Sequence, residues 1–255
     1  GTLTLSGPNT YTGGTAINAG IVSIAADNNL GASAAGVTLN GGILRTTAGI
    51  TNTHAVTIGV GGGTVNVTTT GQYFFNTTNT LLGSGPLNVT GNGTLAAGTG
   101  NLRLAQTNSY SGTVTLNSGG SFEYGVAGAV GTGATFDIGN QGELAAQTGV
   151  SLPNAVTVSG GTNSVLSFEN GTTGNYTGLV TLNANAVVGL RDWYNYATVR
   201  SGTISGQITG AGGITNIAFA IQNQRNGCNR NPSKFCNVRD NWWDCHSYNS
   251  ARVSR

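Results

Sequence analysis

A pattern of about twenty residues that occurs more than once constrains this chain more than any other feature. The segment GTLTLSGPNTYTGGTAINAG at residues 1–20 recurs as GNLRLAQTNSYSGTVTLNSG at residues 100–119, and a shift of 99 residues superposes Tyr11 on Tyr110. A weaker third copy, GNYTGLVTLNANAVVGL, occupies residues 174–190. Repeated units bury their apolar faces by stacking on one another. The repeat therefore predicts a stacked, quasi-one-dimensional architecture.

Short runs between the copies alternate apolar with polar residues, as in GVTLNGGILRT at residues 36–46 and AVTIGVGGGTVNVTT at residues 55–69. Gly-Gly, Asn-Gly or Gly-Asn pairs separate the runs, and these residues readily adopt the positive φ of tight turns. The chain has 43 Gly among 255 residues. It is poor in strong helix formers other than Ala, whereas its many Val, Ile and Thr residues suit a pleated strand. These features predict an all-β fold with strands of about four to six residues.

Two architectures use such strands, an antiparallel hairpin assembly and a right-handed parallel β-helix. Hairpins need two-residue turns that pair each strand with the next one. A solenoid needs equivalent strands that stack, so that inward residues form continuous aliphatic ladders. The L-x-L and V-T-I/L/V units recur at roughly the length of one coil, which favours the parallel β-helix.

The net charge of the chain comes from its last part. Residues 1–224 contain four arginines against six acidic residues, whereas residues 225–255 contain six basic residues against two acidic ones. We therefore expect no nucleic-acid partner for the main body. No apolar run approaches the roughly 20 residues of a membrane span. The chain opens inside a strand-like pattern without a signal peptide, so we expect it to be a piece of a longer protein.

The first copy carries a resemblance to a known family. Its pattern of Gly-Thr-Leu-x-Leu, Asn-x-Tyr-x-Gly and Thr-x-Ile-x-x-Gly in residues 1–20 closely resembles the passenger-associated transport repeat of bacterial autotransporters, the proteins of type V secretion. The segment GGILRTTAGITNTHAVTIGVGGGTVNV at residues 41–67 looks like the linking coils of such passengers, and matches of this type cover most of residues 1–222. The resemblance implies a right-handed parallel β-helix, exported through an outer-membrane translocator barrel and displayed on a Gram-negative cell surface.

The tail from residue 223 to residue 255 differs in character from residues 1–222 and contains the stretch DNWWDCHSY. Trp has one codon, so Trp242 and Trp243 define six bases that read Gly-Gly when the frame moves by one base. With allowed codons the same shift turns the flanking residues into a sequence compatible with TGGTAI at residues 12–17. We therefore expect the tail to be a frame-slipped reading of a further repeat. The alternatives are a native structural tail and a functional Cys/His site.

The functional interpretation of the tail concerns Cys228, Cys236, Cys245 and His246. Their spacing, C-x7-C-x8-C-H, fits no compact zinc pattern. Three is also an odd count for disulfides in an exported protein. We therefore expect no metal site and no cofactor.

Catalysis is considered because many parallel β-helices cleave polysaccharides, which requires paired carboxylates that converge on one face. Stacked coils could unite Asp137 with Glu143, or Glu123 with Glu143, but solvated rim residues are the expected state of these acids. His54 has no acid nearby in sequence and is expected to be a surface turn residue. We assign no catalytic residue and expect a protein that is not an enzyme. The alternative is a fragment of a polysaccharide-acting enzyme, or a passenger with a catalytic domain elsewhere.

One aromatic stretch, GLRDWYNYATVR at residues 189–200, breaks the pattern of the body. Aromatic residues beside Arg are typical of interface hot spots. An aromatic cluster that caps a coil is the alternative. A second aromatic group, residues 73–75, is expected to be an internal stack or a bulge. The candidate ligand-binding residues are Arg191, Asp192, Trp193, Tyr194 and Tyr196.

These observations predict a surface-displayed or secreted stalk that is structural or adhesive. Its polar flank offers rows of Thr, Asn and Ser for many weak contacts, and its ends or lateral edges offer strands for pairing. The expected partners are a host or abiotic surface, a glycan or another copy of the chain, with the translocator barrel as the partner during export.

Overall fold

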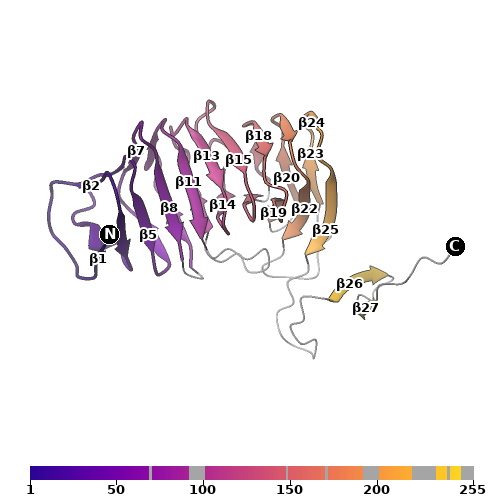
Figure 1. Ribbon diagram of the computed structural model, residues 1–255, viewed down its shortest axis with the longest axis horizontal. Coiled ribbons are helices and arrows are strands. Elements are labelled where there is room, and N and C mark those ends of the chain that lie inside the picture. The colour runs from indigo at the N-terminus through magenta and orange to yellow at the C-terminus, as the bar shows by residue number, and fades with distance from the viewer. Residues whose placement is uncertain are drawn as a thin grey trace. The chain divides into compact units, whose positions relative to one another are not determined.

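The computed structural model describes residues 1–68, 71–91, 101–147, 149–169, 172–191, 201–219, 234–239 and 242–247. The chain divides into two units, Gly1–Phe219 and Ala220–Arg255. The first unit is a stack of β-coils (Figure 1). The predicted boundary between residues 222 and 223 stays a prediction.

Sheet A, the longest sheet, forms one side of the first unit along the whole stack. Its ten strands, in spatial order, are β1 (Thr2–Leu5), β3 (Ile21–Ile24), β5 (Ile43–Thr46), β8 (Gly63–Val67), β11 (Leu87–Gly91), β13 (Thr113–Leu116), β15 (Thr135–Ile138), β18 (Val156–Val158), β21 (Val180–Leu182) and β24 (Ile208–Gly210).

Sheet C forms a second side with eight strands. In spatial order these are β6 (Ile50–Asn52), β9 (Tyr73–Phe75), β12 (Asn101–Leu104), β14 (Ser121–Tyr124), β16 (Glu143–Ala146), β19 (Val165–Glu169), β22 (Ala186–Arg191) and β25 (Ile214–Phe219).

Two shorter sheets share the third side. Sheet B contains β2 (Thr15–Ile17), β4 (Val37–Leu39), β7 (Val56–Ile58) and β10 (Leu81–Gly83). Sheet D contains β17 (Ser151–Leu152), β20 (Thr172–Tyr176) and β23 (Ser201–Ile204). A short 3₁₀ helix, η1 (Asp27–Leu30), follows β3.

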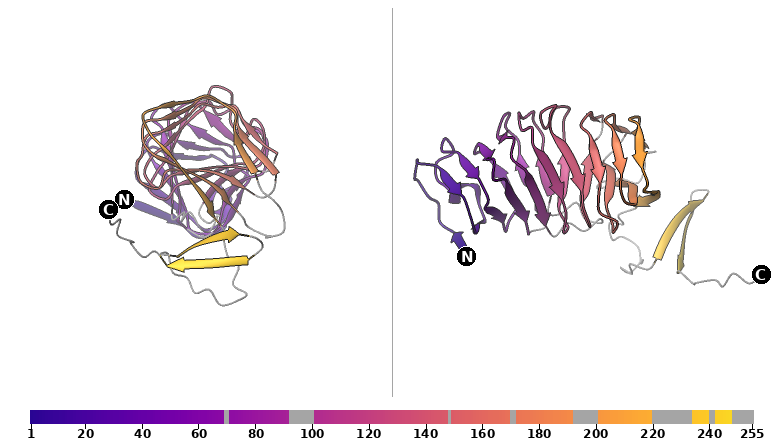
Figure 2. Two further views of the ribbon diagram at one scale, coloured as in Figure 1. Left: turned by 90° about the vertical axis from the view of Figure 1, so that its right-hand side faces the viewer. Right: turned by 45° about the horizontal axis from the view of Figure 1, so that its top comes forward.

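Every strand pair described in the first unit is parallel. Leu3 of β1 pairs with Val22 of β3, 19 residues later, and Tyr73 of β9 pairs with Leu102 of β12, 29 residues later. Parallel neighbours need a crossover of a dozen or more residues. Here the rest of each coil supplies that crossover, as the view along the stack in Figure 2 shows. The structure confirms the all-β class and the parallel β-helix.

The interior is built from ladders of equivalent residues. On sheet C the register aligns Tyr73, Leu102, Phe122, Leu144 and Leu166 on successive strands, and all five side chains are at most 1% exposed. Burying a side chain of this size stabilises the fold by about 1.5–3 kcal/mol. The ladders therefore build a continuous core without a large central cluster.

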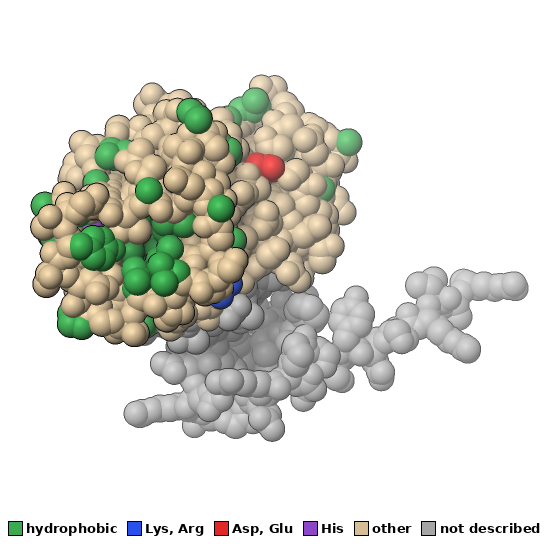
Figure 3. Space-filling view, turned by 60° about the vertical axis from the view of Figure 1, so that its left-hand side comes forward, with side chains coloured by type: hydrophobic (Ala, Val, Ile, Leu, Met, Phe, Trp, Pro, Cys, Tyr) green, Lys and Arg blue, Asp and Glu red, His purple; other side chains and the backbone are tan. Residues whose placement is uncertain are grey.

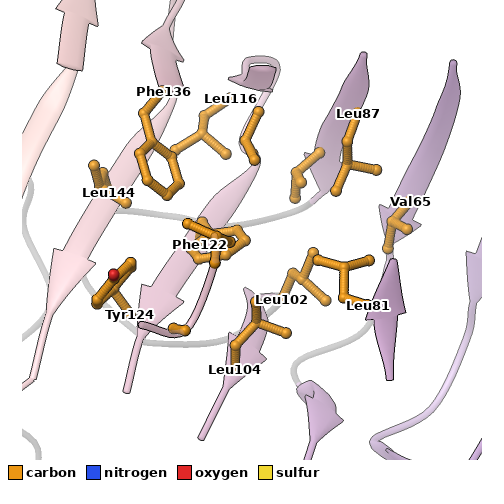
Figure 4. Packing of buried hydrophobic residues seen from close by; sticks show 14 of the residues in the cluster. Val65, Leu81, Leu87, Leu102, Leu104, Leu116, Phe122, Tyr124, Phe136 and Leu144 are labelled. Carbon is orange, nitrogen blue, oxygen red and sulfur yellow. The ribbon is translucent and has the colours of Figure 1, made fainter. Parts of the chain in front are cut away.

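Ladders from different sheets meet inside each coil (Figure 4). Phe136 of sheet A contacts Phe122 of sheet C with ring centroids 5.2 Å apart and the ring planes at 68°. Tyr124 makes a similar contact with Phe136 at 6.2 Å. Edge-to-face contacts of this kind fix the relative position of the two walls.

The two clear copies of the repeat do not occupy equivalent positions in the stack. Leu3 lies on β1 in sheet A, whereas its counterpart Leu102 lies on β12 in sheet C. A shift of 99 residues corresponds to four coils and one further side. Within each copy, however, the pairing is the same, because Leu3 pairs with Val22 and Leu102 pairs with Phe122.

Buried asparagines join neighbouring coils at the corners. Asn108 accepts hydrogen bonds from the backbone N–H groups of Thr80 and Leu81, and its amide donates to the carbonyls of Gln106 and Ala129. Backbone polar groups at buried corners need partners because water cannot reach them. One side chain thus satisfies backbone groups of three coils.

None of the helical segments in the part of the chain that the structure describes has the length and apolar character needed to cross a membrane.

Candidate binding surfaces

The outer face of sheet C carries a cluster of charged and polar side chains. Phe122 and Tyr124 belong to the interior, so the alternation of the strand places Ser121 and Glu123 of β14 on the opposite face. Glu123 is nevertheless only 1% exposed. This face is therefore buried around β14.

Several donors surround the carboxylate of Glu123. Asn101 and Gln72 donate their amide N–H groups to Oε2 over 2.8 Å and 3.1 Å, and Gln147 donates to Oε1. The Nε atom of Arg103 lies 3.0 Å from Oε1. A buried carboxylate is tolerated when charged and neutral donors replace its lost hydration. These contacts favour the ionised form of Glu123.

Arg103 links this carboxylate to an aromatic ring. Its guanidinium carbon lies 5.0 Å from the centroid of the Phe74 ring, a cation–π contact. The register aligns Phe74, Arg103 and Glu123 on the successive strands β9, β12 and β14. The Arg103 side chain is 29% exposed, so this row reaches solvent only in part.

Glu143 belongs to the same outer face on the next strand, β16. Ser167 donates its hydroxyl to Oε1 over 2.7 Å, and Ser121 donates to Oε2 over 3.3 Å. In the register Glu143 pairs with Ser121 whereas Glu123 pairs with Ala145, so the two acids are offset by two residues on adjacent strands. The structure thus brings Glu123 and Glu143 to one face, as one of the two possible pairings required.

The prediction that these acids are solvated rim residues is wrong for Glu123 and Glu143, which are 1% and 4% exposed. The prediction assumed an outer sheet face open to water. Asp137 lies on the outer face of sheet A, on β15, so the possible pair of Asp137 with Glu143 is not brought together. A hydrolytic pair needs one carboxyl group that holds a proton and a second that reaches water or sugar. The contacts of Glu123 and their burial instead describe a structural charge cluster.

His54 is also misplaced by the sequence prediction. It is fully buried rather than a surface turn residue, and its Nδ1 atom lies 3.2 Å from Oδ1 of Asp27. Asp27 also accepts hydrogen bonds from the backbone N–H and the hydroxyl of Thr53. Asp27 precedes His54 by 27 residues, about one coil, so the pairing was invisible without the coil register. It joins η1 to the loop after β6.

The outer face of sheet A has a different chemistry. One row of outward positions crosses seven successive strands, and nearly all its members are Thr or Asn. Its members are Thr64, Asn88, Thr115, Asp137, Thr157, Thr181 and Thr209.

These side chains are half-buried rather than buried. Neighbouring outer positions form hydrogen bonds along the stack, with Thr113 Oγ1 2.9 Å from Thr135 Oγ1 and the Asn66 amide donating to Thr90 Oγ1 over 2.9 Å. Few charged side chains reach the face shown in Figure 3. Sheet A therefore presents a neutral polar surface, as the sequence predicted for the solenoid flank.

Most of the predicted ligand-binding residues lie outside the described part of the chain, namely Asp192, Trp193, Tyr194 and Tyr196. Arg191 is the last residue of β22, and its register partners are Glu169 of β19 and Phe219 of β25. The aromatic stretch stays a predicted binding site.

The second aromatic stretch divides between the two faces of sheet C. Tyr73 and Phe75 lie in the interior, with ring centroids 5.0 Å apart at 75°. This confirms the expected internal stack. Phe74 lies on the outer face beneath Arg103. Among the described residues, no group of three or more His, Cys, Asp or Glu side chains is placed to hold a metal ion.

A parallel β-solenoid with recurring strand-turn units defines a class of elongated repeat proteins, and comparison with known families narrows that class. Residues 1–24 and 96–120 match the passenger-associated transport repeat family. The chain is therefore an autotransporter passenger segment that carries these repeats, and such passengers are displayed at the outer membrane of Gram-negative bacteria.

One curated relative is the adhesin BmaC autotransporter of Brucella suis biovar 1 (strain 1330). It is 48% identical to this chain over 65 residues, which is 26% of this chain. The aligned segment spans only 2% of that protein's length. No solved structure matches the chain.

Proposed function

We propose that this chain is part of a non-catalytic adhesive stalk that mediates attachment or self-association at the bacterial surface. The carrying observation is the outward Thr/Asn row of sheet A, which continues over seven successive strands. Each hydroxyl or amide offers one weak hydrogen bond that competes with water. Regular repetition along a stiff scaffold turns many weak contacts into useful avidity.

The interior supports this role because it makes the scaffold stiff. Continuous ladders and coil-joining asparagines hold successive strands at the ordinary spacing of about 4.8 Å. A row of donors and acceptors at fixed spacing is organised in advance, which lowers the entropic cost of binding an extended partner. A glycan, a host or abiotic surface, and a second copy of the chain are the partners that such a row suits.

The name of the Brucella relative adds support for adhesion. That protein is described as an adhesin. We extend the property to this chain as part of the proposal, together with a translocator barrel as the partner during export. The aromatic site at Arg191, Asp192, Trp193, Tyr194 and Tyr196 stays a second predicted contact.

The proposal is tested by placing charge on the row. Thr115, Thr157 and Thr181 are replaced together by Lys in the chain displayed on a bacterial surface. The readouts are adhesion to glycan-coated and abiotic surfaces and sedimentation of the cells. Because three lysines interrupt the contacts and repel one another, we expect adhesion or aggregation to fall roughly tenfold.

A matched control adds the same charge elsewhere. Ala16, Thr38 and Ser151 are exposed positions on sheets B and D, and all three are changed to Lys. Equal surface display is verified with an antibody to an added tag. Equal losses in both triple variants would count against the row as the adhesive surface.

We also propose that residues 223–255 are the slipped reading of a further repeat. Support comes from the Gly-Gly that Trp242 and Trp243 encode in the neighbouring frame. The DNA sequence around and beyond codon 223 tests this proposal. A continuing Gly-Thr-Leu pattern in the alternate frame is expected, and an intact written frame would overturn it.

A further inference from the structure

The second unit contains a strand pair of a different kind from those of the first unit. Strand β26 (Lys234–Arg239) pairs with β27 (Trp242–Ser247) in antiparallel orientation, and two residues separate the strands. The register places Cys236 directly opposite Cys245. The parallel coils of the first unit have no counterpart of this cross-strand cysteine pair.

The backbone geometry of an antiparallel pair suits a disulfide. Directly opposed residues have Cα atoms about 4.5 Å or about 5.5 Å apart, depending on their hydrogen-bonding position. Disulfide-linked cysteines have Cα separations of about 4.4–6.8 Å. Both types of opposed position fall in this range, so closing the bond requires no movement of the backbone.

The same register defines an apolar face. Alternate residues of a strand share a face, so Cys236 and Val238 of β26 share one face with Trp243 and Cys245 of β27. A two-stranded hairpin is at best marginally stable in water without further support. A covalent link beside Val238 and Trp243 supplies such support.

The cellular location favours the oxidised form, because disulfides form and persist in proteins outside the reducing cytosol. We propose that Cys236 and Cys245 form an intrachain disulfide that closes the hairpin β26–β27 and leaves Cys228 as the unpaired thiol. This inference goes beyond the adhesive role, since it assigns a covalent modification to the second unit.

The oxidation requires an external disulfide, such as oxidised glutathione. The thiolate of one cysteine attacks the external disulfide, forms a mixed disulfide and releases one glutathione thiol. The thiolate of the second cysteine then attacks the cysteine sulfur of the mixed disulfide and releases the second glutathione. The two protein thiols lose two protons and two electrons in total, and one oxidised glutathione becomes two reduced molecules.

The test uses the complete 255-residue chain, so its outcome does not depend on how the gene is read in its natural host. The protein is equilibrated in a glutathione redox buffer, unfolded without reductant, and alkylated. Intact mass then counts the alkylated cysteines, and peptide mapping locates any cross-link. We expect one alkylated cysteine, Cys228, and a cross-linked peptide that joins Cys236 to Cys245.

Two variants define the specificity of the pairing. Cys228→Ser is expected to leave no alkylated cysteine in a monomeric chain. Equilibration of the unmodified chain in urea, which removes the register, is expected to lower the fraction with the Cys236–Cys245 link at least severalfold. Three alkylated cysteines in the folded chain, a cross-link that involves Cys228, or a disulfide between two chains would each overturn the proposal.

Discussion

The Nε atom of Arg103 lies 3.0 Å from Oε1 of Glu123, and these two residues stand side by side on β12 and β14. Glu123 is 1% exposed, so a carboxylate of the wall is buried with its counter-ion beside it. The stability of this wall therefore depends on a charge pair that the composition of the chain, with only 7% charged residues, does not suggest.

Removing the cation should destabilise the solenoid. In Arg103→Met the apolar stem stays, but Glu123 keeps a buried charge without its cation. We expect the free energy of unfolding in urea to fall by about 2–3 kcal/mol. The control Arg45→Met removes an arginine whose Nε donates to Asn66, and a change within about 1 kcal/mol is expected. The added change Glu123→Gln should recover part of the loss in Arg103→Met, and equal effects of both arginine changes would contradict this account.

The equivalent tyrosines of the two repeat copies should respond differently to loss of their hydroxyl groups. The hydroxyl of Tyr110 is buried, 2.8 Å from the carbonyl oxygen of Gly85 and 2.9 Å from that of Thr113. Tyr11 is 37% exposed, and its hydroxyl lies 2.7 Å from that of Thr15. We expect Tyr110→Phe to cost about 1–2 kcal/mol in urea unfolding and Tyr11→Phe to cost less than about 0.5 kcal/mol. Similar costs would mean that the Tyr110 hydroxyl contributes nothing beyond its ring.

Alkaline pH should weaken the solenoid through its buried tyrosines. Burial raises the pKa of Tyr73, Tyr110 and Tyr124 above the ordinary value, and the charge of Asp27 adds to the rise of the Tyr73 pKa. The native state then holds protons that the unfolded state releases above a pH of about 10. Stability is fully present below that pH and falls as the pH rises further, by at most about 1.4 kcal/mol per pH unit for each tyrosine.

Urea unfolding at several pH values from neutral to strongly alkaline measures this slope. Tyr110→Phe should flatten it, because one linked proton is removed, whereas Tyr11→Phe should leave it unchanged. An alkaline slope that is the same in the wild-type chain and in Tyr110→Phe would refute the linkage for this residue.

The corner asparagine should be among the least replaceable polar residues. Asn108→Leu leaves the N–H groups of Thr80 and Leu81 and the carbonyls of Gln106 and Ala129 without the partner that the side chain supplies. We expect a loss of about 3–5 kcal/mol in the free energy of unfolding, because several buried polar groups lose hydrogen bonds together.

An exposed asparagine provides the matched control for this change. Asn140 accepts one exposed hydrogen bond from the N–H of Thr162 over 3.1 Å. Asn140→Leu should therefore cost less than about 1 kcal/mol. If the two changes cost the same, the clamp described for the corner would be wrong.

Two glycines that the repeat aligns should differ in their tolerance of a methyl group. A Cβ atom on Gly112 would lie 2.4 Å from the Gly85 carbonyl oxygen, 2.5 Å from the Tyr110 hydroxyl oxygen and 2.7 Å from the Ser84 carbonyl oxygen. A Cβ atom on Gly13 would meet nothing within 4 Å. We expect Gly112→Ala to lower the thermal midpoint by several degrees and Gly13→Ala to leave it unchanged or slightly raised. A Gly13→Ala variant as unstable as Gly112→Ala would contradict the structural difference between the copies.

The sequence by itself determined the all-β class, the parallel coil and the family resemblance. Each depends on local periodicity that survives without tertiary information: alternate residues such as Val37 and Leu39 point to one face, and glycine pairs mark the turns. The interior position of Tyr73 and Phe75 followed from the same alternation.

Only the tertiary structure decided which residues of different coils meet. Coils of 19 to 29 residues vary in length, so sequence separation did not reveal that Asp27 lies beside His54 or that Glu123 and Glu143 share a buried face. The same variation places Tyr11 and Tyr110, aligned in sequence, on different sides of the stack and in different degrees of burial. Register between coils is a sum over every turn that precedes it, and this sum is available only once the chain is wound.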